Sequence, residues 1–430
     1  MSRPNVKRIV RYLGKRENAL DFERIADPRA RRGRRWSLRS LLTATFIAMV
    51  AQEHNLRGVE RLTRDLSGCR RRLGIPRRVP DSTLAHFFAR LDDEVGLRQV
   101  LVDDIKRAHR RKALQPVGVP IGVVAIDGKT IWCDRKRVDD PACQAMPQTE
   151  RTYYRLHALH AVLVSTPTQP CIDQMLVPAE TNEMGALPAF LEQLTGAYGH
   201  TSLLEVVSMD AGMTSIENAR QVTACELRYV MAVKESQPTL LAEIERQCGR
   251  GAHKQVGHVC EARTAWERYR GKEIRRELFR SSDIRGWSGW ESARQVWRVK
   301  QTTKHPNGTT EVENRYFITS LPWDRLSGPE ILRLVRLHWG VENGCHWTMD
   351  VVLGEDAHPW CTKGRALRML SWLRLLAYNA LRLLRGRYLR SSRSRTMPWN
   401  ELRRLVRRAL EHPTAWRSGA NAEAVTTTLQ

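Results

Sequence analysis

The sequence predicts a multidomain α/β protein with a mixed sheet at its centre and helical regions at both ends. Three observations lead to this prediction. A β-branched run over residues 120–126 opens a region in which strand-like and helix-like segments alternate as far as residue 248. A second stretch, residues 249–322, is richer in strand signals. The segments before residue 116 and after residue 322 have helical spacing of their apolar residues.

Residues 1–115 are expected to form a helical, basic domain. Between residues 1 and 40 there are 13 Lys or Arg and only 4 Asp or Glu. Three helices are expected, over residues 41–51 with Ser37 as N-cap, over residues 55–66, and after a cap at Asp81-Ser82-Thr83. Short helices joined by turns favour a helix-turn-helix-like DNA-binding fold. A bundle that only packs on the next domain is the alternative, and the basic runs 29–35 and 70–78 favour DNA.

The net charge indicates the class of partner. The chain has 71 Lys and Arg against 46 Asp and Glu, a formal charge of +25. An extended polyanion is therefore a more natural partner than an acidic small molecule, and nucleic acid is the leading candidate. Most of the excess is Arg, whose planar guanidinium suits bidentate contacts to phosphate and guanine.

The cysteines and the apolar stretches indicate the compartment. Nine cysteines are scattered along the chain, and none forms a C-x-x-C pair, which argues against a disulfide framework or a zinc ribbon. We expect reduced, mostly buried thiols. The first twelve residues lack an apolar signal core, and the longest apolar stretch, residues 41–51, is too short to span a bilayer. A cytoplasmic, bacterial-type and nucleoid-associated location is expected, without membrane contact.

Two Asp residues of the central region stand where strands are expected to end. Asp127-Gly128 follows the run 120–126, and a strand over 203–209 delivers Asp210. The other segments expected here are strands over 156–165, 171–177 and 228–233, and helices over 186–195, 215–225 and 239–247. A carboxylate at a strand end is typical of a functional site. Because Asp before a small residue is also a common turn former, an ordinary loop is the alternative for each.

A long helix is expected after the strand-rich stretch. Ser327 can cap it, and it carries Glu342 with His338 and His346 at i−4 and i+4 on the same face. Two alternatives stay open: His338, Glu342 and His346 could form a transition-metal site, and Asp350, Glu355 and Asp356 compete with Glu342 as site carboxylates. Between residues 361 and 410 there are 14 Lys or Arg and one acid. Residues 387–430 are expected to be a basic C-terminal tail, with residues 390–395 as a linker or phosphate-binding loop.

The segment His338-Trp339-Gly340-Val341-Glu342-Asn343, followed by His346-Trp347, Asp350-Val351 and Glu355-Asp356, resembles the insertion-sequence DDE transposases of the H-repeat-associated protein group. Other matching pieces follow in the same order: Ala125-Ile126-Asp127-Gly128-Lys129, Leu156-His157-Ala158-Leu159-His160, Asn182-Glu183, Asp210-Ala211, Val233-Lys234 with Gln237, and Tyr316-Phe317-Ile318-Thr319-Ser320. Each piece is short, and their order makes the resemblance specific. Together they cover roughly residues 120–385.

This resemblance implies a ribonuclease H-like core in two parts, residues 116–248 and 323–386, separated by a β-rich insertion at 249–322. It implies that Asp127, Asp210 and Glu342 are the catalytic and metal-binding residues. Mg²⁺ is the expected cofactor, with two ions and with Mn²⁺ able to replace it. The implied reaction is strand cleavage at the ends of the element, followed by attack of the freed 3′-hydroxyl on target DNA. The implied partners are double-stranded DNA with terminal inverted repeats and target DNA, with a homodimer when two ends synapse.

The chain departs from the wider superfamily near Glu342, where a Tyr, an Arg and a Lys are usual and this sequence aligns Val335, His338 and Met349. The secondary candidates for DNA phosphate contact are Lys234, Arg336, His338 and His346. Trp287, Trp290 and Trp297 of the insertion could wedge a flipped base, although β-core packing is the expected role. Two alternatives to an active transposase stay open: a catalytically decayed, transposase-derived DNA-binding protein, and a metal-dependent DNA nuclease without strand transfer.

Overall fold

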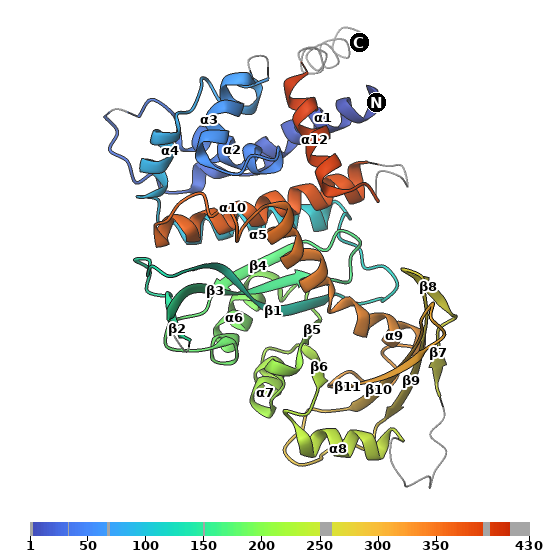
Figure 1. Cartoon of the computed structure of the whole chain (residues 1–430). Helices are drawn as coiled ribbons and strands as arrows, with labels where there is room; N and C mark the ends of the chain where they lie inside the picture. Colours follow the sequence, from blue (N-terminus) through green and yellow to red (C-terminus); the bar gives the residue numbers. More distant parts are fainter. Residues whose placement is uncertain are drawn as a thin grey trace, which may run out of the picture.

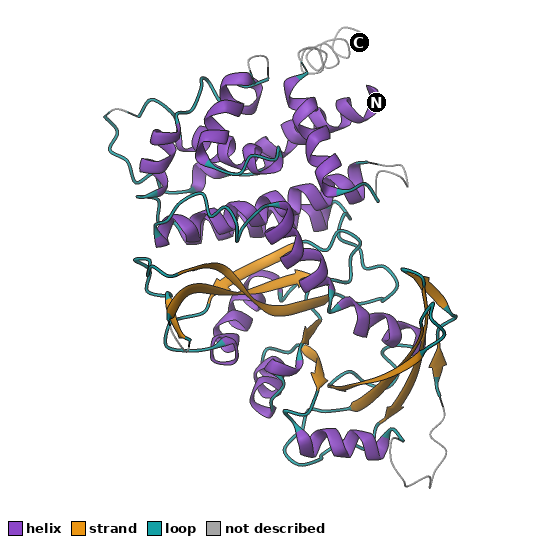
Figure 2. Cartoon of the chain, in the orientation of Figure 1, coloured by secondary structure: helices purple, strands orange, loops and turns teal. Residues whose placement is uncertain are grey.

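A helical layer and a long mixed sheet make up the molecule (Figures 1 and 2). The computed structural model describes residues 3–32, 34–66, 69–148, 151–249, 260–389 and 396–412. Helix α10, Gly364–Leu383, crosses between the N-terminal helices and the sheet, packed against α2, Leu38–Val50, and α5, Glu94–Arg110. The predicted class, α/β with a mixed sheet flanked by helices, is confirmed.

The N-terminal region is helical, as predicted. Its other helices are α1, Arg3–Ala19, α3, Leu56–Asp65, and α4, Asp81–Phe88, with single 3₁₀ turns at Phe22–Arg24 and Arg71–Leu73. Ser37 accepts a hydrogen bond from the Ser40 N–H at 3.1 Å, so the predicted cap is confirmed. Asn55, the first residue of the second predicted helix, also caps it and accepts from the Gly58 N–H at 2.8 Å. The cap predicted at Asp81-Ser82-Thr83 was wrong, because Asp81 is already helical and supplies the negative charge that a first turn favours.

Five central strands have the order β4-β3-β1-β5-β6, with β2 added beyond part of β3. The pairs β4–β3 and β3–β1 are antiparallel, whereas β1–β5 and β5–β6 are parallel. The bounds are β1, Val123–Asp134; β2, Gln144–Pro147; β3, Thr152–Leu163; β4, Cys171–Leu176; β5, Val206–Met209; and β6, Arg228–Val233. Helices α6, Glu183–Tyr198, α7, Ile216–Ala224, and α8, Pro238–Gln247, connect them on the side away from α10 (Figure 1).

Strand β1 is longer than the sequence predicted. The turn expected at Asp127-Gly128 was wrong, because β1 continues to pair with β3 beyond that point, with Asp127 opposite His160. Gly128 is required for space. A Cβ atom there would lie 1.9 Å from the Glu183 Oε1 and 2.7 Å from the His157 Nε2. The glycine therefore marks a close approach of side chains to the strand, a second common role of glycine inside strands.

The strand-rich stretch extends the central sheet instead of forming a separate one. Strand β11 pairs antiparallel with β6, and β10, β9 and β7 follow in order. The bounds are β7, Ala262–Arg263; β8, Glu267–Tyr269; β9, Lys272–Ser281; β10, Gln295–Lys304; and β11, Thr310–Thr319. Gly308 has a φ of +83° in the predicted hairpin turn. Trp290 and Trp297 are buried and Trp287 is partly buried, which confirms that these three side chains pack in the core.

The helix predicted after Ser327 is interrupted. The capping box of Ser327 and Glu330 begins α9, Gly328–Leu337, as predicted, but π-helical segments follow at η4, Val341–His346, and η5, Thr348–Val352. The Trp347 N–H donates to the Glu342 carbonyl, a bond between residues five apart. The C-terminal elements are α10, η6, Leu384–Tyr388, and α12, Trp399–Glu411, while the segment 390–395 lies outside the described residues.

The cysteines are free thiols, as predicted, and most are buried or partly buried, with Cys133 exposed. Within the described ranges, no helix combines the length and apolarity that crossing a membrane requires.

Asn379 fastens helix α10 to the edge of the sheet. Its side chain accepts from the Cys171 N–H at 2.9 Å and donates to the Cys171 carbonyl at 2.7 Å, and it is fully buried. Asn379→Leu keeps the volume but leaves two buried backbone groups without partners, so we expect a loss of about 2–4 kcal/mol in the free energy of unfolding by urea. Arg365→Ala, at a half-exposed position of the same helix, should change it by less than about 0.5 kcal/mol. Equal effects of the two variants would contradict this account.

Candidate active site

Asp127, Asp210 and Glu342 approach one another from three elements. Strands β1 and β5 are parallel neighbours with Ala125 opposite Ser208, so Asp127 and Asp210 each stand two residues beyond a paired position and at the same level. Asp210 follows β5 and caps the 3₁₀ turn Ala211–Met213, accepting from the Met213 N–H at 3.2 Å. Glu342 is carried by η4, which packs on β1 and β3.

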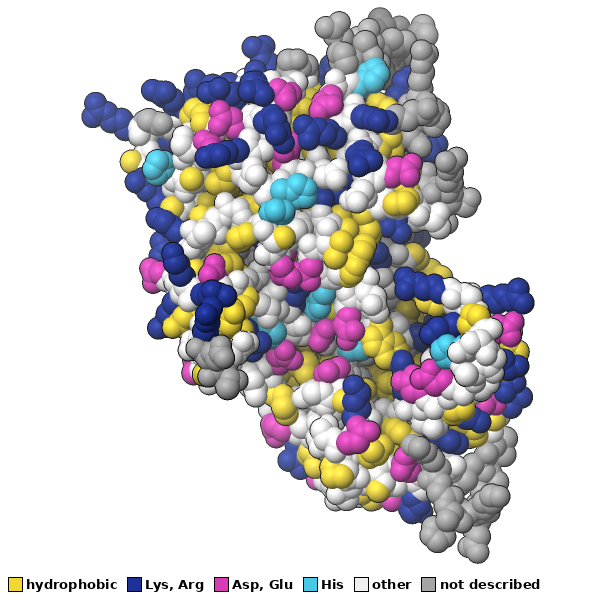
Figure 3. Space-filling view, in the orientation of Figure 1, with side chains coloured by type: hydrophobic (Ala, Val, Ile, Leu, Met, Phe, Trp, Pro, Cys, Tyr) yellow, Lys and Arg dark blue, Asp and Glu magenta, His cyan; other side chains and the backbone are white. Residues whose placement is uncertain are grey.

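The electrostatics of Asp127 show that these carboxylates share one region. Burial is the largest cause that raises the pKa of Asp127, and the negative charges of Asp210, Glu342 and Glu183 add to it. Together they raise this pKa to about 7. Among the described residues, Asp127, Asp210 and Glu342 have no Lys or Arg ion-pair partner. On the face drawn in Figure 3, Asp and Glu side chains gather in the middle of the molecule, while Lys and Arg crowd the N-terminal helices. A cation would relieve this uncompensated charge.

The three carboxylates do not form a compact cage for a single ion. In the described part of the chain, the compact group of donor atoms, all within 4.8 Å, belongs to His160, Cys171 and Cys345. All three side chains are buried, and burial raises the pKa of the Cys171 thiol and lowers that of His160, so these two groups are neutral. Mg²⁺ takes oxygen ligands and keeps several waters, so it does not require a compact set of protein donors.

Lys129 pairs with the three acids that are the alternatives to Glu342 as site carboxylates. Its buried ammonium forms an ion pair with Asp350 and lies 3.4 Å from Glu355 and 3.8 Å from Asp356. Glu355 is completely buried, and Arg374 lies 3.8 Å from it. These three acids therefore neutralise a buried lysine. Glu342, by contrast, is exposed and lines a pocket of about 690 Å³ together with Asp210.

His338 and His346 are neutral imidazoles. Burial lowers the pKa of His338 to about 4 and that of His346 to about 3. The His338 Nδ1 lies 3.1 Å from the Ser208 hydroxyl, and the His346 Nδ1 lies 3.5 Å from the Asp127 Oδ2. Because the two rings contact different strands, they do not form the transition-metal site with Glu342 that helical spacing allowed. A neutral ring can donate a hydrogen bond but carries no charge toward phosphate.

The two basic residues predicted to contact DNA phosphate, Lys234 and Arg336, lie in different places. Lys234 lines the pocket with Asp210 and Glu342 and has no ion-pair partner in the described ranges. Arg336 does not line that pocket, because it donates to Glu267 of β8 at 3.1 Å. Sequence reasoning missed Arg315 of β11, which lines the pocket and stacks on Trp339, with its guanidinium carbon 4.0 Å from the ring centroid. Arg315 lies on a strand that is distant in sequence from Glu342, so the sequence contains no signal that it lines the same pocket.

A fourth carboxylate, Glu183, was also missed as a site residue. It stands at the start of α6, after the Asn182 cap, and its Oε1 lies 2.7 Å from the His157 Nε2. This hydrogen bond lowers the pKa of Glu183 and keeps it negative beside Asp127. The Asn182-Glu183 pair was visible among the motif pieces, and that was the only signal.

The two Trp residues near Glu342 lie in different environments. Trp339 lines the pocket and packs against Arg315, whereas Trp347 is 47% exposed.

A cluster of carboxylates on neighbouring strands and a helical segment, with Lys and Arg near it, defines an α/β protein suited to divalent cations and phosphate groups. The chain belongs to the transposase DDE domain family, which matches residues 119–380. It is an insertion-sequence transposase of the DDE family, as the resemblance predicted.

The chain is also similar to two named relatives and to one solved structure. YncI of Escherichia coli O157:H7, provisionally named a transposase, is 23% identical over 319 residues, 72% of this chain and 71% of YncI. YhhI of Escherichia coli K12, provisionally named an H repeat-associated transposase, is 25% identical over 267 residues, 60% of this chain and 64% of YhhI. The piggyBac transposase synaptic complex with hairpin DNA has a TM-score of 0.43 at 11% identity, covering 100% of this chain and 81% of that one.

The raised pKa of Asp127 predicts how stability depends on pH in protein kept free of divalent cations. Its folded pKa of about 7 exceeds the ordinary 3.8, so its stabilising contribution is complete below pH 4 and is lost as the pH rises through 7. Asp127→Asn should therefore unfold with a free energy about 4 kcal/mol higher than the unsubstituted protein at pH 8, and with little difference at pH 4.

Urea unfolding in the presence of a chelator, at both pH values, measures this difference. Asp139→Asn, at an exposed carboxylate without an ion pair among the described residues, is the control and should show no gain at pH 8. A gain that does not depend on pH would show that Asp127 is not held next to like charges.

Proposed function

We propose that this transposase cleaves DNA strands at the ends of its element and transfers the freed 3′-hydroxyl to target DNA, using Asp127, Asp210 and Glu342. The observation that carries the proposal is that Asp210 and Glu342 line one pocket and lie close enough to Asp127 to raise its pKa, all inside the residues matched by the DDE family. We also propose that the core is ribonuclease H-like. The strand order β4-β3-β1-β5-β6, with antiparallel pairs on one side of β1 and parallel pairs on the other, supports this.

The DDE transposase family uses divalent metal ions. Asp127, Asp210 and Glu342 would hold two Mg²⁺ ions, because they offer only oxygen donors and have a charge that no neighbouring Lys or Arg balances within the described ranges. When bound, such ions activate an oxygen nucleophile and stabilise the leaving oxygen. Mn²⁺ accepts the same ligands and is expected to substitute.

The chain's own residues position the phosphodiester. Lys234, directly after β6, would neutralise phosphate charge, and Arg315 of β11 would do so after releasing Glu313, to which it donates at 2.7 Å. His338 and His346 would contribute as neutral donors, since burial keeps both uncharged at pH 7. Arg336 would contact DNA only after releasing Glu267. The main contribution of the protein is electrostatic positioning of the scissile bond.

The proposed partners are double-stranded DNA with terminal inverted repeats and target DNA, with two chains meeting when two ends synapse. We propose that residues 1–115 are the DNA-binding domain, that residues 249–322 are an insertion between the core parts 116–248 and 323–386, and that residues 387–430 are a basic tail. A cytoplasmic, nucleoid-associated location belongs to the same proposal.

One observation favours a second candidate, a catalytically decayed protein that still binds DNA. The positions where the superfamily has a Tyr and a Lys are Val335 and Met349 here, and both are buried. They cannot contact phosphate. Lys234 and Arg315 offer replacement charges, which is why activity is proposed first.

Incubation of the protein with Mg²⁺ and DNA that includes the flanking inverted repeats tests the proposal. We expect strand cleavage that Asp127→Ala and Glu342→Gln each reduce by at least about 10²-fold, because each removes an ion ligand. Glu235→Gln, at an exposed carboxylate of the same pocket, is the matched control and should retain activity. Tight binding without cleavage would establish the decayed alternative, and cleavage without strand transfer would establish a nuclease.

A further inference from the structure

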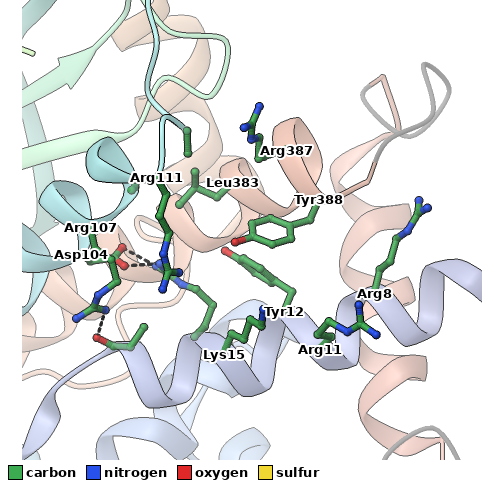
Figure 4. Close-up of a pocket in the computed structure, with 14 residues that line it drawn as sticks. Arg8, Arg11, Tyr12, Lys15, Asp104, Arg107, Arg111, Leu383, Arg387 and Tyr388 are labelled. Carbon is green, nitrogen blue, oxygen red and sulfur yellow. Dashed lines mark hydrogen bonds and ion pairs between the residues drawn. The ribbon is translucent and has the colours of Figure 1, made fainter. Parts of the chain in front are cut away.

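A basic cleft lies apart from the carboxylates, between α1, α5 and η6 (Figure 4). Its volume is about 500 Å³. Its lining includes seven basic side chains and one acid: Arg8, Arg11, Lys15, Arg16, Arg107, Arg111, Arg387 and Asp104. None of the residues that line it lines the pocket of Asp210 and Glu342. The cleft is therefore a separate, strongly positive site.

The single acid of the cleft does not offset this charge. Arg16 binds Asp104 through both of its terminal nitrogens, with Nη2 2.7 Å from Oδ2, and both side chains are buried. Arg107 donates to the Ala19 carbonyl. The remaining five cations, Arg8, Arg11, Lys15, Arg111 and Arg387, have no hydrogen bond or ion pair to any described residue, and all five are exposed. They are free to bind an external anion.

A second hollow of about 320 Å³ continues this surface and shares Ala113 and Arg387 with the first. It adds the basic side chains of Lys112, Arg382 and Arg385, and no acid lines it. Arg382 and Arg385 belong to its wall, since Arg382 donates to the Thr168 carbonyl at 2.6 Å and Arg385 stacks on Trp399 at 4.3 Å. The two hollows together form one extended basic track.

Lys112, which lines the second hollow, has a left-handed backbone. Lys112 has a φ of +54° at the end of α5, in the left-handed region where glycine is favoured. The Ala113 N–H bonds to the Ala108 carbonyl at 3.0 Å and the Lys112 N–H to the His109 carbonyl at 2.8 Å, the pattern that usually ends a helix on glycine. The chain therefore holds a lysine, at a conformational disadvantage, at the mouth of the track.

We propose that this track binds the phosphate backbone of duplex DNA at a site distinct from the carboxylates. The inference rests on the proposed function only in that a transposase acts on DNA. Arg8, Arg11 and Lys15 share one face of α1 and span about 10 Å along it, a length that covers about three phosphates of one strand. Five free cations on three elements exceed what a small anion needs.

The aromatic residues of the cleft favour duplex over single-stranded nucleic acid. Tyr12 is buried, its hydroxyl donates to the Ala380 carbonyl at 2.7 Å, and its ring packs on Tyr388 at 4.5 Å. Single-strand sites present exposed rings on which bases stack. Here the rings pack on each other and fix α1 near the end of α10, and the exposed charged side chains of the cleft are cations, which suits a paired helix read by its phosphates.

Fluorescence anisotropy of a labelled duplex that carries the element's end, titrated over a salt series, tests the proposal with the full chain. Arg11→Gln/Lys15→Gln should lower the slope of log affinity against log salt by about 2 and weaken binding about tenfold. Lys272→Gln/Arg285→Gln removes the same charges from exposed positions near the insertion strands and should leave both values unchanged. Identical affinities and slopes for the two double variants would overturn the proposal, as would a loss confined to single-stranded DNA or RNA.

Lys112→Gly separates binding from folding. It removes one charge and relieves the left-handed backbone, so the melting temperature should stay equal or rise while the salt slope falls by about 1. An unchanged slope would overturn the role of Lys112 in the track. The outcomes are also distinct from those for the proposed function: if the protein never cleaves but binds through these cations, only the proposed function fails. If it cleaves and Arg11→Gln/Lys15→Gln binds as tightly as the control, only this inference fails.

Discussion

Repulsion among the carboxylates around Asp127 is the constraint that the rest of the structure must overcome. The fold buries Asp127 beside Asp210, Glu342 and Glu183, and each added negative charge makes ionisation of Asp127 less favourable. Such an arrangement forms only if other contacts hold the elements in place. The pairing of β1 with β3 and β5 fixes the two Asp residues, and the grip of Asn379 on Cys171 ties the sheet to α10. Stability elsewhere thus maintains an unfavourable centre that a divalent cation would relieve.

Lys129 pairs with the acids that follow Glu342 in the chain and leaves Glu342 available at the pocket. Sequence reasoning could not separate Glu342 from Asp350, Glu355 and Asp356, because all four follow the insertion within a few turns of helix. The structure separates them by charge: three surround one buried ammonium, and Glu342 faces the pocket. A lysine two residues after Asp127 in β1 therefore pairs with the acids of a segment more than two hundred residues away.

Local signals were sufficient for much of the fold. Ser37 was predicted as a cap, and Asn55 and Ser215 as the first residues of helices; each accepts a backbone hydrogen bond from the residue three positions later, because capping depends on near neighbours. Non-local effects were not predictable. Gly128 resembled a turn because its true reason, the approach of Glu183 and His157, comes from other elements. Asp127, Asp210 and Glu342 could be predicted because the motif pieces that contain them occur in the order typical of the family. Arg315, on a distant strand, belongs to none of these pieces.

The docking of α1 on the end of α10 has a consequence for synthesis. The Tyr12 hydroxyl donates to the Ala380 carbonyl and its ring packs on Tyr388, so α1 can be seated only after a segment 368 residues later in the chain has been synthesised. Termination before residue 380 would yield chains in which α1 lacks its packing partner. Such a product, however well its central sheet forms, would present an incomplete surface.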